Sequence, residues 1–409
     1  MRPDIAADHI SVYSPRQYLR GKKICLIATV SYHLVNQLKN QAEYLRDLGM
    51  SVVLVSSGGP EVQHIRIGPH LRYAIIPIPR SLAPWKDLAA LFRLTLFFHK
   101  NRFDIVHSTT PKAGFLSATS AFLAGVPIRL HTFTGQPWVT LKGVMRWGSR
   151  MADRLIGILN TKCYADSGSQ AKFLVSEGII PPRKIAVIGH GSLAGVDIDR
   201  FSSNQLSLSV KRQLKQSLSI DASSKIIIFV GRIAPDKGIA ELISAFKELL
   251  KMDYNVDLLL LGPHDKDCGG INSLDLDSAR QCPRLHYLGY AESPEKYLAI
   301  SDIFCLPSYR EGFGTVVIEA AAAGLPTVGT AIYGLTDAVV DGETGILVPP
   351  HDDRALGEAL KRLLDHPDEL HRMGRAARER CLLHFDARQI NEKIAEEYVN
   401  LLKMKKIIH

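Results

Sequence analysis

The first pattern that could do chemistry lies at residues 229–238, where an apolar run ends in Gly231-Arg232 and continues to Lys237-Gly238. If the apolar run is a strand followed by a helix, the turn presents free backbone N–H groups to an anion. Arg232 and Lys237 can flank one anion, and a diphosphate fits best because it carries two charges and can depart as a leaving group. The alternative is that both cations are ordinary surface residues of a βα loop.

A second pattern, Glu311-Gly-Phe-Gly-Thr315 followed by Glu319, stands between another apolar run and an expected helix. Glycines at 312 and 314 let backbone N–H groups approach a ligand closely. Carboxylates repel phosphate, so Glu311 and Glu319 require a different ligand group. Sugar hydroxyls meet this requirement because they donate hydrogen bonds to carboxylates. An ordinary helix-capping acid is the alternative, and the flanking glycines disfavour it.

Together these patterns, Gly-Arg-x4-Lys-Gly and Glu-Gly-Phe-Gly-x4-Glu-Ala, resemble retaining glycosyltransferases of family 4, which have the GT-B fold and include enzymes of bacterial surface-polysaccharide assembly. The run Val340–Pro349 is also similar to theirs. The resemblance implies that the cations bind the donor diphosphate and that Glu319 binds ribose hydroxyls. It also implies that Glu311, with the amides of Gly312 to Thr315, holds the donor sugar and phosphate. The implied donor site consists of Gly231, Arg232, Lys237, Glu311, Gly312, Phe313, Gly314, Thr315 and Glu319.

The N-terminal half resembles the family less closely. His131 ends an expected strand, Pro127–His131, and the resemblance implies that it reaches the donor sugar across a cleft. The alternative is a strand-end histidine whose hydrogen bonds are satisfied within the fold. The first βα loop, residues 28–33, lacks the glycine pair of many relatives, so the acceptor side departs from the pattern. The expected catalytic residues are His131, Arg232, Lys237 and Glu311.

The candidate acceptor residues are Lys112, Thr134 and Gln136. Lys112 lies in Thr109–Gly114, which follows an expected strand and opens a helix with Pro111. Such a helix start can bind an acceptor phosphate, with the lysine beside it. A plain helix cap explains the segment equally well.

Lys142, Arg146, Arg150 and Arg154 recur every four residues and draw a basic stripe along an expected helix. Apolar side chains, including Trp147, accompany the stripe. A basic amphipathic helix is typical of a membrane-surface contact. The alternative is a solvated outer face of a Rossmann-type helix.

Charge is unevenly distributed, because residues 1–200 carry 25 Lys/Arg against 12 Asp/Glu and the remainder carries 25 against 29. The basic half predicts an anionic partner. Nucleic acid is disfavoured because aromatic residues do not interleave the stripe and the second half is acidic. No apolar run is long enough to span a bilayer, so we expect peripheral contact with an anionic membrane surface. No signal peptide and no C-x-x-C pair is visible, which favours the cytoplasm, at the inner face of the membrane.

We expect no bound metal and no cofactor, since a nucleotide-sugar is a substrate. Three Asp-x-Asp triplets, at 197–199, 265–267 and 275–277, are attributed to chance. The alternation of strand-like and helical runs predicts an α/β protein with two Rossmann-like domains facing across a cleft. The expected division is an acceptor-binding domain at 1–200, a nucleotide-sugar-binding domain at 201–385, and a C-terminal helix at 386–409 that packs back toward the first domain.

The resulting hypothesis is a retaining hexosyltransferase. It would move a hexosyl or N-acetylhexosaminyl unit from a UDP-sugar to a polyprenyl-diphosphate-linked saccharide. A sugar-nucleotide epimerase of the same fold and a non-catalytic nucleotide-sugar-binding protein are the alternatives.

Overall fold

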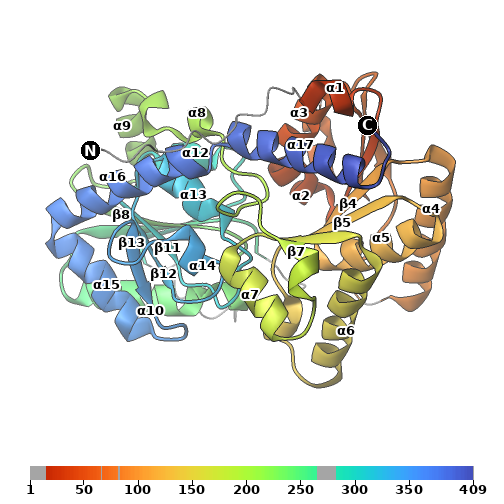
Figure 1. The fold of residues 1–409 in the computed structure, drawn as a ribbon. Helices are drawn as coiled ribbons and strands as arrows, with labels where there is room; N and C mark the ends of the chain where they lie inside the picture. The colour runs from red at the N-terminus through yellow and green to blue at the C-terminus, as the bar shows by residue number, and fades with distance from the viewer. Residues whose placement is uncertain (1–14, 66, 82, 265–281, 409) are drawn as a thin grey trace, which may run out of the picture.

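The computed structural model describes residues 15–65, 67–81, 83–264 and 282–408, which form two α/β domains (Figure 1). The described strands form two sheets, each parallel throughout. The N-terminal sheet has the order β3-β2-β1-β4-β5-β6-β7, and the C-terminal sheet has the order β10-β9-β8-β11-β12-β13. The predicted fold, two Rossmann-like domains, is therefore confirmed.

The N-terminal strands are β1 Lys23–Val30, β2 Ser51–Ser57, β3 Leu71–Ile75, β4 Ile105–Thr109, β5 Ile128–Phe133, β6 Lys162–Ala165 and β7 Ile185–Ala186. The helices of this half are α1 Pro15–Leu19, α2 Ser31–His33, a π-helix at Leu34–Leu38, α3 Lys39–Asp47, α4 Pro84–Asn101, α5 Pro111–Leu123, α6 Gly143–Leu159 and α7 Gly168–Ser176.

The C-terminal strands are β8 Lys225–Val230, β9 Val256–Leu261, β10 Leu285–Gly289, β11 Ile303–Leu306, β12 Thr327–Thr330 and β13 Gly345–Val348. Their helices are α8 Ile198–Phe201, α9 Leu208–Ser217, α10 Ile239–Lys251, α12 Pro294–Leu298, α13 Thr315–Ala322, α14 Leu335–Ala338, α15 Asp353–Asp365, α16 Pro367–His384 and α17 Ala387–Met404.

Strand β1 shows why the N-terminal sheet is covered on both faces. Its side chains alternate, so Ile24 and Leu26 join the core under α3 and α17, whereas Cys25 and Ile27 join the core under α4 and α5. A parallel strand buried on both faces is apolar on both, which explains the continuous apolar run at residues 24–28.

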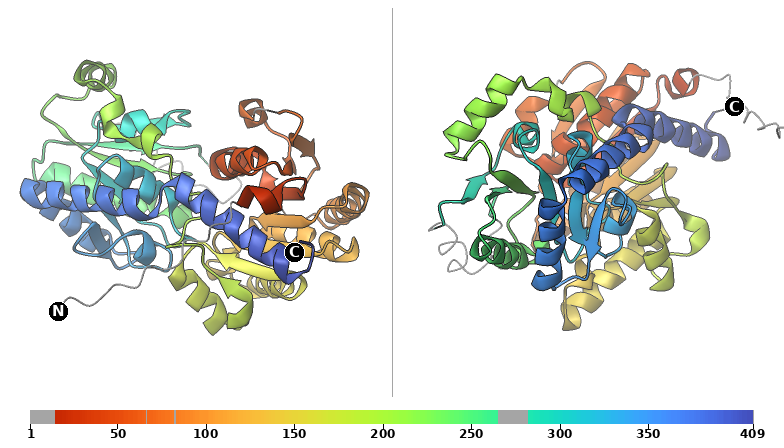
Figure 2. Two further views of the ribbon diagram at one scale, coloured as in Figure 1. Left: turned by 45° about the horizontal axis from the view of Figure 1, so that its top comes forward. Right: turned by 90° about the vertical axis from the view of Figure 1, so that its left-hand side faces the viewer.

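Helix α17 leaves the C-terminal domain and lies on the N-terminal one (Figures 1 and 2). Its Tyr398 hydroxyl accepts a hydrogen bond from Gln41 Nε2 at 3.1 Å and lies 2.7 Å from His107 Nδ1. Where the chain crosses between the domains, the N–H of Val196 donates to the carbonyl of Phe385 at 2.8 Å. The two chain segments that connect the domains, near Val196 and near Phe385, therefore run side by side.

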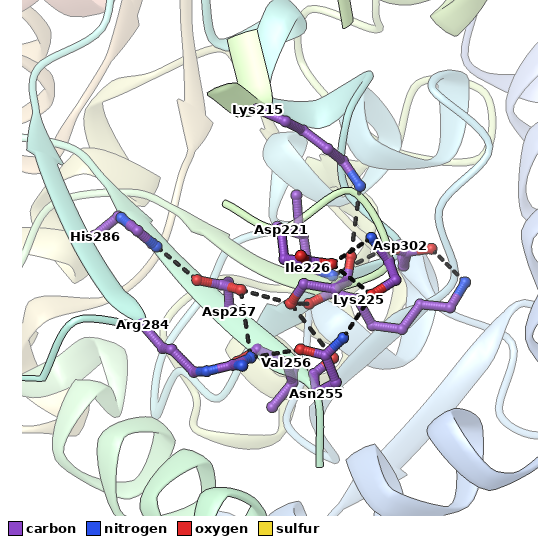
Figure 3. A network of polar contacts seen from close by, with 12 residues as sticks. Lys215, Asp221, Lys225, Ile226, Asn255, Val256, Asp257, Arg284, His286 and Asp302 are labelled. Carbon is purple, nitrogen blue, oxygen red and sulfur yellow. Dashed lines mark hydrogen bonds and ion pairs between the residues drawn. The ribbon is translucent and has the colours of Figure 1, made fainter. Parts of the chain in front are cut away.

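A polar network holds the starts of the C-terminal strands together (Figure 3). Lys225 Nζ, at the start of β8, lies 2.8 Å from Asp302 Oδ1, just before β11. Asp257 Oδ1 in β9 lies 2.7 Å from His286 Nε2 in β10. Parallel strands all start at one edge of a sheet, so this network lies at the edge opposite the loops that follow the strands, and we assign it a structural role.

Strand β5 differs from its prediction because it continues to Phe133, two residues beyond His131. The additional residues pair with β6, where Thr132 lies opposite Tyr164 and Phe133 opposite Ala165. The end of β5 is thus set by a partner strand rather than by local sequence.

Candidate active site at the domain interface

Two loops of the C-terminal domain, Gly231–Gly238 after β8 and Pro307–Thr315 after β11, are here called the C-terminal loops. They lie side by side because β8 and β11 are neighbours in the sheet. Gly238 has a φ of +66°, and a Cβ there would lie 2.0 Å from the carbonyl oxygen of Pro307. The N–H of Tyr309 donates to the carbonyl of Asp236 at 2.9 Å. The fold therefore unites the two sequence patterns.

The C-terminal loops concentrate charge. Lys237 Nζ lies 2.5 Å from Glu311 Oε1, and both side chains are largely buried. Arg310 Nη2 lies 2.8 Å from Asp236 Oδ2. Burial raises the pKa of Asp236, but Lys237, Arg310 and Arg232 outweigh this effect and hold the pKa below its usual range. Three cations therefore gather around one carboxylate.

Arg310 is a member of this cluster that the sequence reasoning missed. The sequence signal that could have identified it is its position directly before Glu311. Its Nη1 is 3.7 Å from the position that a Cβ on Gly135 would occupy, so the side chain also reaches the N-terminal domain. It is thus placed between the predicted diphosphate residues and the acceptor side.

Helix α13 begins beside this cluster, with Gly314 at its N-cap and Thr315 as its first residue. Its N-terminal N–H groups are suited to an anion. Phe313 is buried and packs against Phe385 at a ring-centroid distance of 5.2 Å, so its side chain anchors the loop and only its backbone remains for a ligand.

Glu319 lies one turn inside α13. Burial raises the pKa of its carboxyl group to about 7, with Arg200 opposing this shift and Glu295 adding to it. Burial, followed by Tyr290 and then Glu319, raises the pKa of the hydroxyl of Tyr32, which belongs to the N-terminal domain. Tyr32 also meets Tyr290 edge-on, with 5.9 Å between ring centroids. This aromatic pair across the interface was not predicted.

On the facing side, the loops Thr134–Gln136 after β5 and Asp166–Ser169 after β6 are here called the N-terminal loops. A Cβ on Gly312 would lie 2.7 Å from the carbonyl carbon of Thr134 and 3.1 Å from Asp166 Oδ2. Only glycine at position 312 permits this approach. Thr134, a predicted acceptor residue, therefore lies against Gly312, in the loop predicted to hold the donor sugar.

Asp166 is a buried carboxylate that the sequence reasoning missed. Burial raises its pKa to about 7, a backbone hydrogen bond from Leu193 opposes the shift, and Glu311 adds to it. Its Oδ1 has no hydrogen-bond partner among the described residues. A second missed contact comes from the π-helix, where Gln37 Oε1 lies 3.4 Å from Thr315 Oγ1.

His131 does not reach this interface, in contrast to the prediction. Its ring is buried, packs against Gly114 and Phe133, and has Nδ1 2.9 Å from Ser108 Oγ. Burial first, and then repulsion by His107, lower its pKa to about 3, with a Ser108 hydrogen bond opposing the shift. The physical reason is the longer β5, which places His131 inside the sheet and leaves Thr134 at its carboxyl end.

Two candidate acceptor residues also have other partners. Gln136 is fully buried, and its Oε1 accepts a 3.3 Å hydrogen bond from Gln170 Nε2. Lys112 Nζ forms a 2.7 Å ion pair with Asp87 and donates to the carbonyl of Ser81 at 3.0 Å. Both side chains are thus bonded to residues of the N-terminal domain.

The basic stripe divides into two parts. Arg150 pairs with Glu177 at 3.1 Å and lies over the Trp138 ring, and Arg154 donates to the carbonyl of Gly178 at 3.2 Å. Lys142 and Arg146 are exposed. The four cations of the predicted stripe are therefore not equivalent, because the end of α7 packs against the second half of α6.

Among the described residues, no group of three or more His, Cys, Asp or Glu side chains is placed to hold a metal ion. Asp197 caps α8, and Asp199 lies 3.8 Å from Arg388. The other two Asp triplets lie outside the described residues. None of the described helices combines the length and apolar character needed to cross a bilayer.

Comparisons with known proteins identify a family for each domain. The family model for "Glycosyl transferases group 1" matches residues 210–380, and that for "Glycosyl transferase 4-like domain" matches residues 34–191. The capsular polysaccharide biosynthesis glycosyltransferase CapM of Staphylococcus aureus is 32% identical over 94% of this chain and 99% of its own length.

Two further proteins extend the comparison. A UDP-Gal:alpha-D-GlcNAc-diphosphoundecaprenol alpha-1,3-galactosyltransferase of Escherichia coli is 26% identical over 79% of this chain and 82% of its own. The structure of Anabaena HepE in complex with UDP and glucose has a TM-score of 0.76 at 19% identity, over 93% of this chain and all of that one.

The two parallel domains, joined across a charged loop pair, define a GT-B glycosyltransferase. The chain belongs to the group 1 glycosyltransferases, in agreement with the family 4 resemblance of its sequence. The family is named for glycosyl transfer, the first of the three activities considered from the sequence.

Proposed function

We propose that this enzyme transfers a hexosyl or N-acetylhexosaminyl unit from a UDP-sugar, with retention of anomeric configuration, to a polyprenyl-diphosphate-linked saccharide in surface-polysaccharide synthesis. The single observation that carries the proposal is the joining of the two C-terminal loops through the Lys237–Glu311 pair. The pair supports the proposal because a cation suited to a diphosphate lies next to a carboxylate suited to sugar hydroxyls.

The pair also suggests how donor binding changes the site. A diphosphate beside Lys237 competes with Glu311 for the ammonium group, because both are anions within reach of Nζ. Glu311 is then free to accept a hydrogen bond from a sugar hydroxyl, while Ser308 Oγ, 2.8 Å from Oε1, holds the carboxylate in place. Donor binding and sugar positioning are thus coupled.

During transfer, negative charge develops on the departing diphosphate. Arg232, Lys237 and the first N–H groups of α13 stabilise that charge, and fixed donors of this kind act without reorganisation. In a front-face displacement the leaving phosphate oxygen takes the proton of the acceptor hydroxyl. Glu319, from its position one turn inside α13, accepts hydrogen bonds from the ribose.

The acceptor proposal rests on two supports. The N-terminal half carries a net positive charge, with 25 Lys/Arg against 12 Asp/Glu in residues 1–200, which suits a diphosphate-bearing acceptor. The E. coli relative is named for a diphosphoundecaprenol acceptor and a UDP-galactose donor, and the HepE structure contains UDP. We propose the inner face of the cell membrane as the place of reaction.

The test is transfer of labelled sugar from UDP-, GDP- and ADP-sugars to a lipid extract. We expect label in the lipid phase with a UDP-sugar, and an anomeric linkage of the same configuration as the donor. Lys237→Met serves as the inactive control. Label that stays in the aqueous phase with every donor contradicts the lipid acceptor, and an inverted linkage contradicts retention.

We also propose that transfer needs no divalent metal, because cationic side chains and helix N–H groups neutralise the diphosphate. Activity should persist in EDTA. Loss of activity on chelation that manganese or magnesium restores would show that the proposal is wrong.

A further inference from the structure

Helix α4 carries apolar side chains on both of its faces. Ala90, Leu94 and Phe98 are buried in the core beneath it. On the opposite face, Trp85, Leu88 and Phe92 are 85%, 57% and 65% exposed. Spacings of three and four residues place these three side chains on one stripe of the helix. An exposed apolar stripe of this kind marks an interaction site, because a solvated helix gains nothing from it.

Helix α6 has a similar exposed group at its start. Val144, Met145 and Trp147 are exposed, and Trp147 is 67% exposed. Helix α5 packs between α4 and α6, and the three lie over one face of the N-terminal sheet (Figure 1). We propose that the exposed residues of α4 and of the start of α6 form one docking surface for an anionic lipid bilayer.

The surface adjoins the acceptor side of the site. Helices α4, α5 and α6 each follow a parallel strand, so all three begin at the edge where the strands end. Lys112 in the first turn of α5 binds Asp87 in the first turn of α4, which holds the two helix starts together. Thr134, which touches the donor loop at Gly312, precedes α6 by fewer than ten residues. A bilayer on this surface thus lies beside the N-terminal loops.

Charge favours a lipid partner over a second copy of the chain. The exposed cations include Lys86, Arg93 and Arg146. Helix α4 contains one acidic residue, Asp87, which is neutralised by Lys112, and α6 contains one, Asp153, which is buried. A surface with exposed cations and no exposed carboxylate on either helix attracts anionic headgroups. Two copies of it repel each other in a symmetric contact.

The inference deepens the proposed function, on whose lipid-linked acceptor it rests, and vesicle binding tests it separately. The full chain is sedimented with phosphatidylcholine vesicles, with and without added phosphatidylglycerol. We expect binding to the anionic vesicles and a loss of about tenfold or more in partitioning for Trp85→Ser/Phe92→Ser, because two large apolar side chains no longer insert. The matched control is Leu208→Ser/Leu383→Ser, which changes two residues that are 73% and 66% exposed in the C-terminal domain.

The dependence of vesicle binding on salt distinguishes the contribution of the cations from that of the apolar residues of α4. Lys142→Gln/Arg146→Gln should weaken binding at low salt, and the difference from the parent should shrink as salt rises. The α4 variant should stay weak at all salt concentrations.

The inference is overturned if the α4 variant binds vesicles like the parent, or if the parent binds no anionic vesicles. It is also overturned if the α4 variant only dissociates an oligomer while vesicle binding is unchanged. If the parent binds vesicles through α4 but transfers no sugar to lipid, the docking surface stands and the proposed acceptor fails.

Discussion

The two sides of the domain interface draw on different kinds of residue. The C-terminal loops supply three cations around Asp236, and one of these cations, Lys237, is also paired with Glu311. The N-terminal loops supply Thr134, a buried Asp166 and backbone atoms, each from the end of a different strand. Charge is thus concentrated on the side that we propose binds the leaving diphosphate, while the proposed acceptor side depends on strand ends brought together by the sheet.

This difference has a chemical reason. A diphosphate can be held by any oriented set of cations and N–H groups, so one βα loop and its neighbour suffice. Positioning an acceptor hydroxyl requires shape on several sides, which separate strands provide. Variants on the two sides should therefore fail in different ways.

The largest effect is expected on the C-terminal side. Lys237→Met should lower kcat by roughly 10²–10³, because an oriented cation near the leaving diphosphate is lost. Steady-state kinetics with purified protein measure this, and Lys247→Met, an exposed lysine on α10, is the matched control. A variant with near-parental kcat would remove Lys237 from the diphosphate site.

The next effect tests the contact between the two sides. Gly312→Ala should lower kcat/KM by roughly 10², since its Cβ meets Thr134 at 2.7 Å and displaces the donor loop from the acceptor side. The control is Gly148→Ala in α6, where an added Cβ has no neighbour within 4 Å. Equal activity of the two variants would mean that the loops separate during turnover.

Asp166→Asn tests the buried carboxylate through stability. The folded-state pKa of about 7 exceeds the ordinary 3.8, so the folded protein holds the proton more tightly than the unfolded chain. The resulting stabilisation is complete below about pH 4 and is lost as pH rises through about 7. The asparagine variant should therefore gain about 1–4 kcal/mol relative to the parent between pH 4 and pH 8.

Urea unfolding at several pH values measures this gain. Phosphate-free buffers and a fixed ionic strength keep ligand and salt effects out of the comparison. A difference between variant and parent that does not change with pH would show that the carboxylate is already hydrated in the folded protein.

The smallest effect on turnover is expected for His131→Asn. The amide can still bond Ser108, and the side chain does not face the C-terminal loops, so kcat per folded molecule should stay close to that of the parent. Its stability should fall because the smaller side chain fills less of the core. A well-folded variant with a strongly reduced kcat would show that His131 does take part in catalysis.

Much of the C-terminal side was predictable from sequence. Strand β8 ends just before Gly231, as the sequence predicted, and Arg232, Lys237 and Glu311 lie in the loops that follow β8 and β11. Apolar runs bounded by glycine, and charges within a few residues of them, can be recognised within a short stretch of sequence. The sequence therefore determined the fold class, the strands beneath the site and the positions of Lys237 and Glu311 in loops, whereas their ion pair is a tertiary contact.

Only the tertiary structure decided the N-terminal side. Because β5 pairs with β6 as far as Phe133, the strand ends two residues later than predicted. Thr134 therefore lies at the interface, where His131 was expected. Arg150 of the stripe forms an ion pair with Glu177 at the end of α7. The position of α4 over the sheet determines which of its apolar residues are buried. These outcomes depend on partners distant in sequence, so no local pattern contains them.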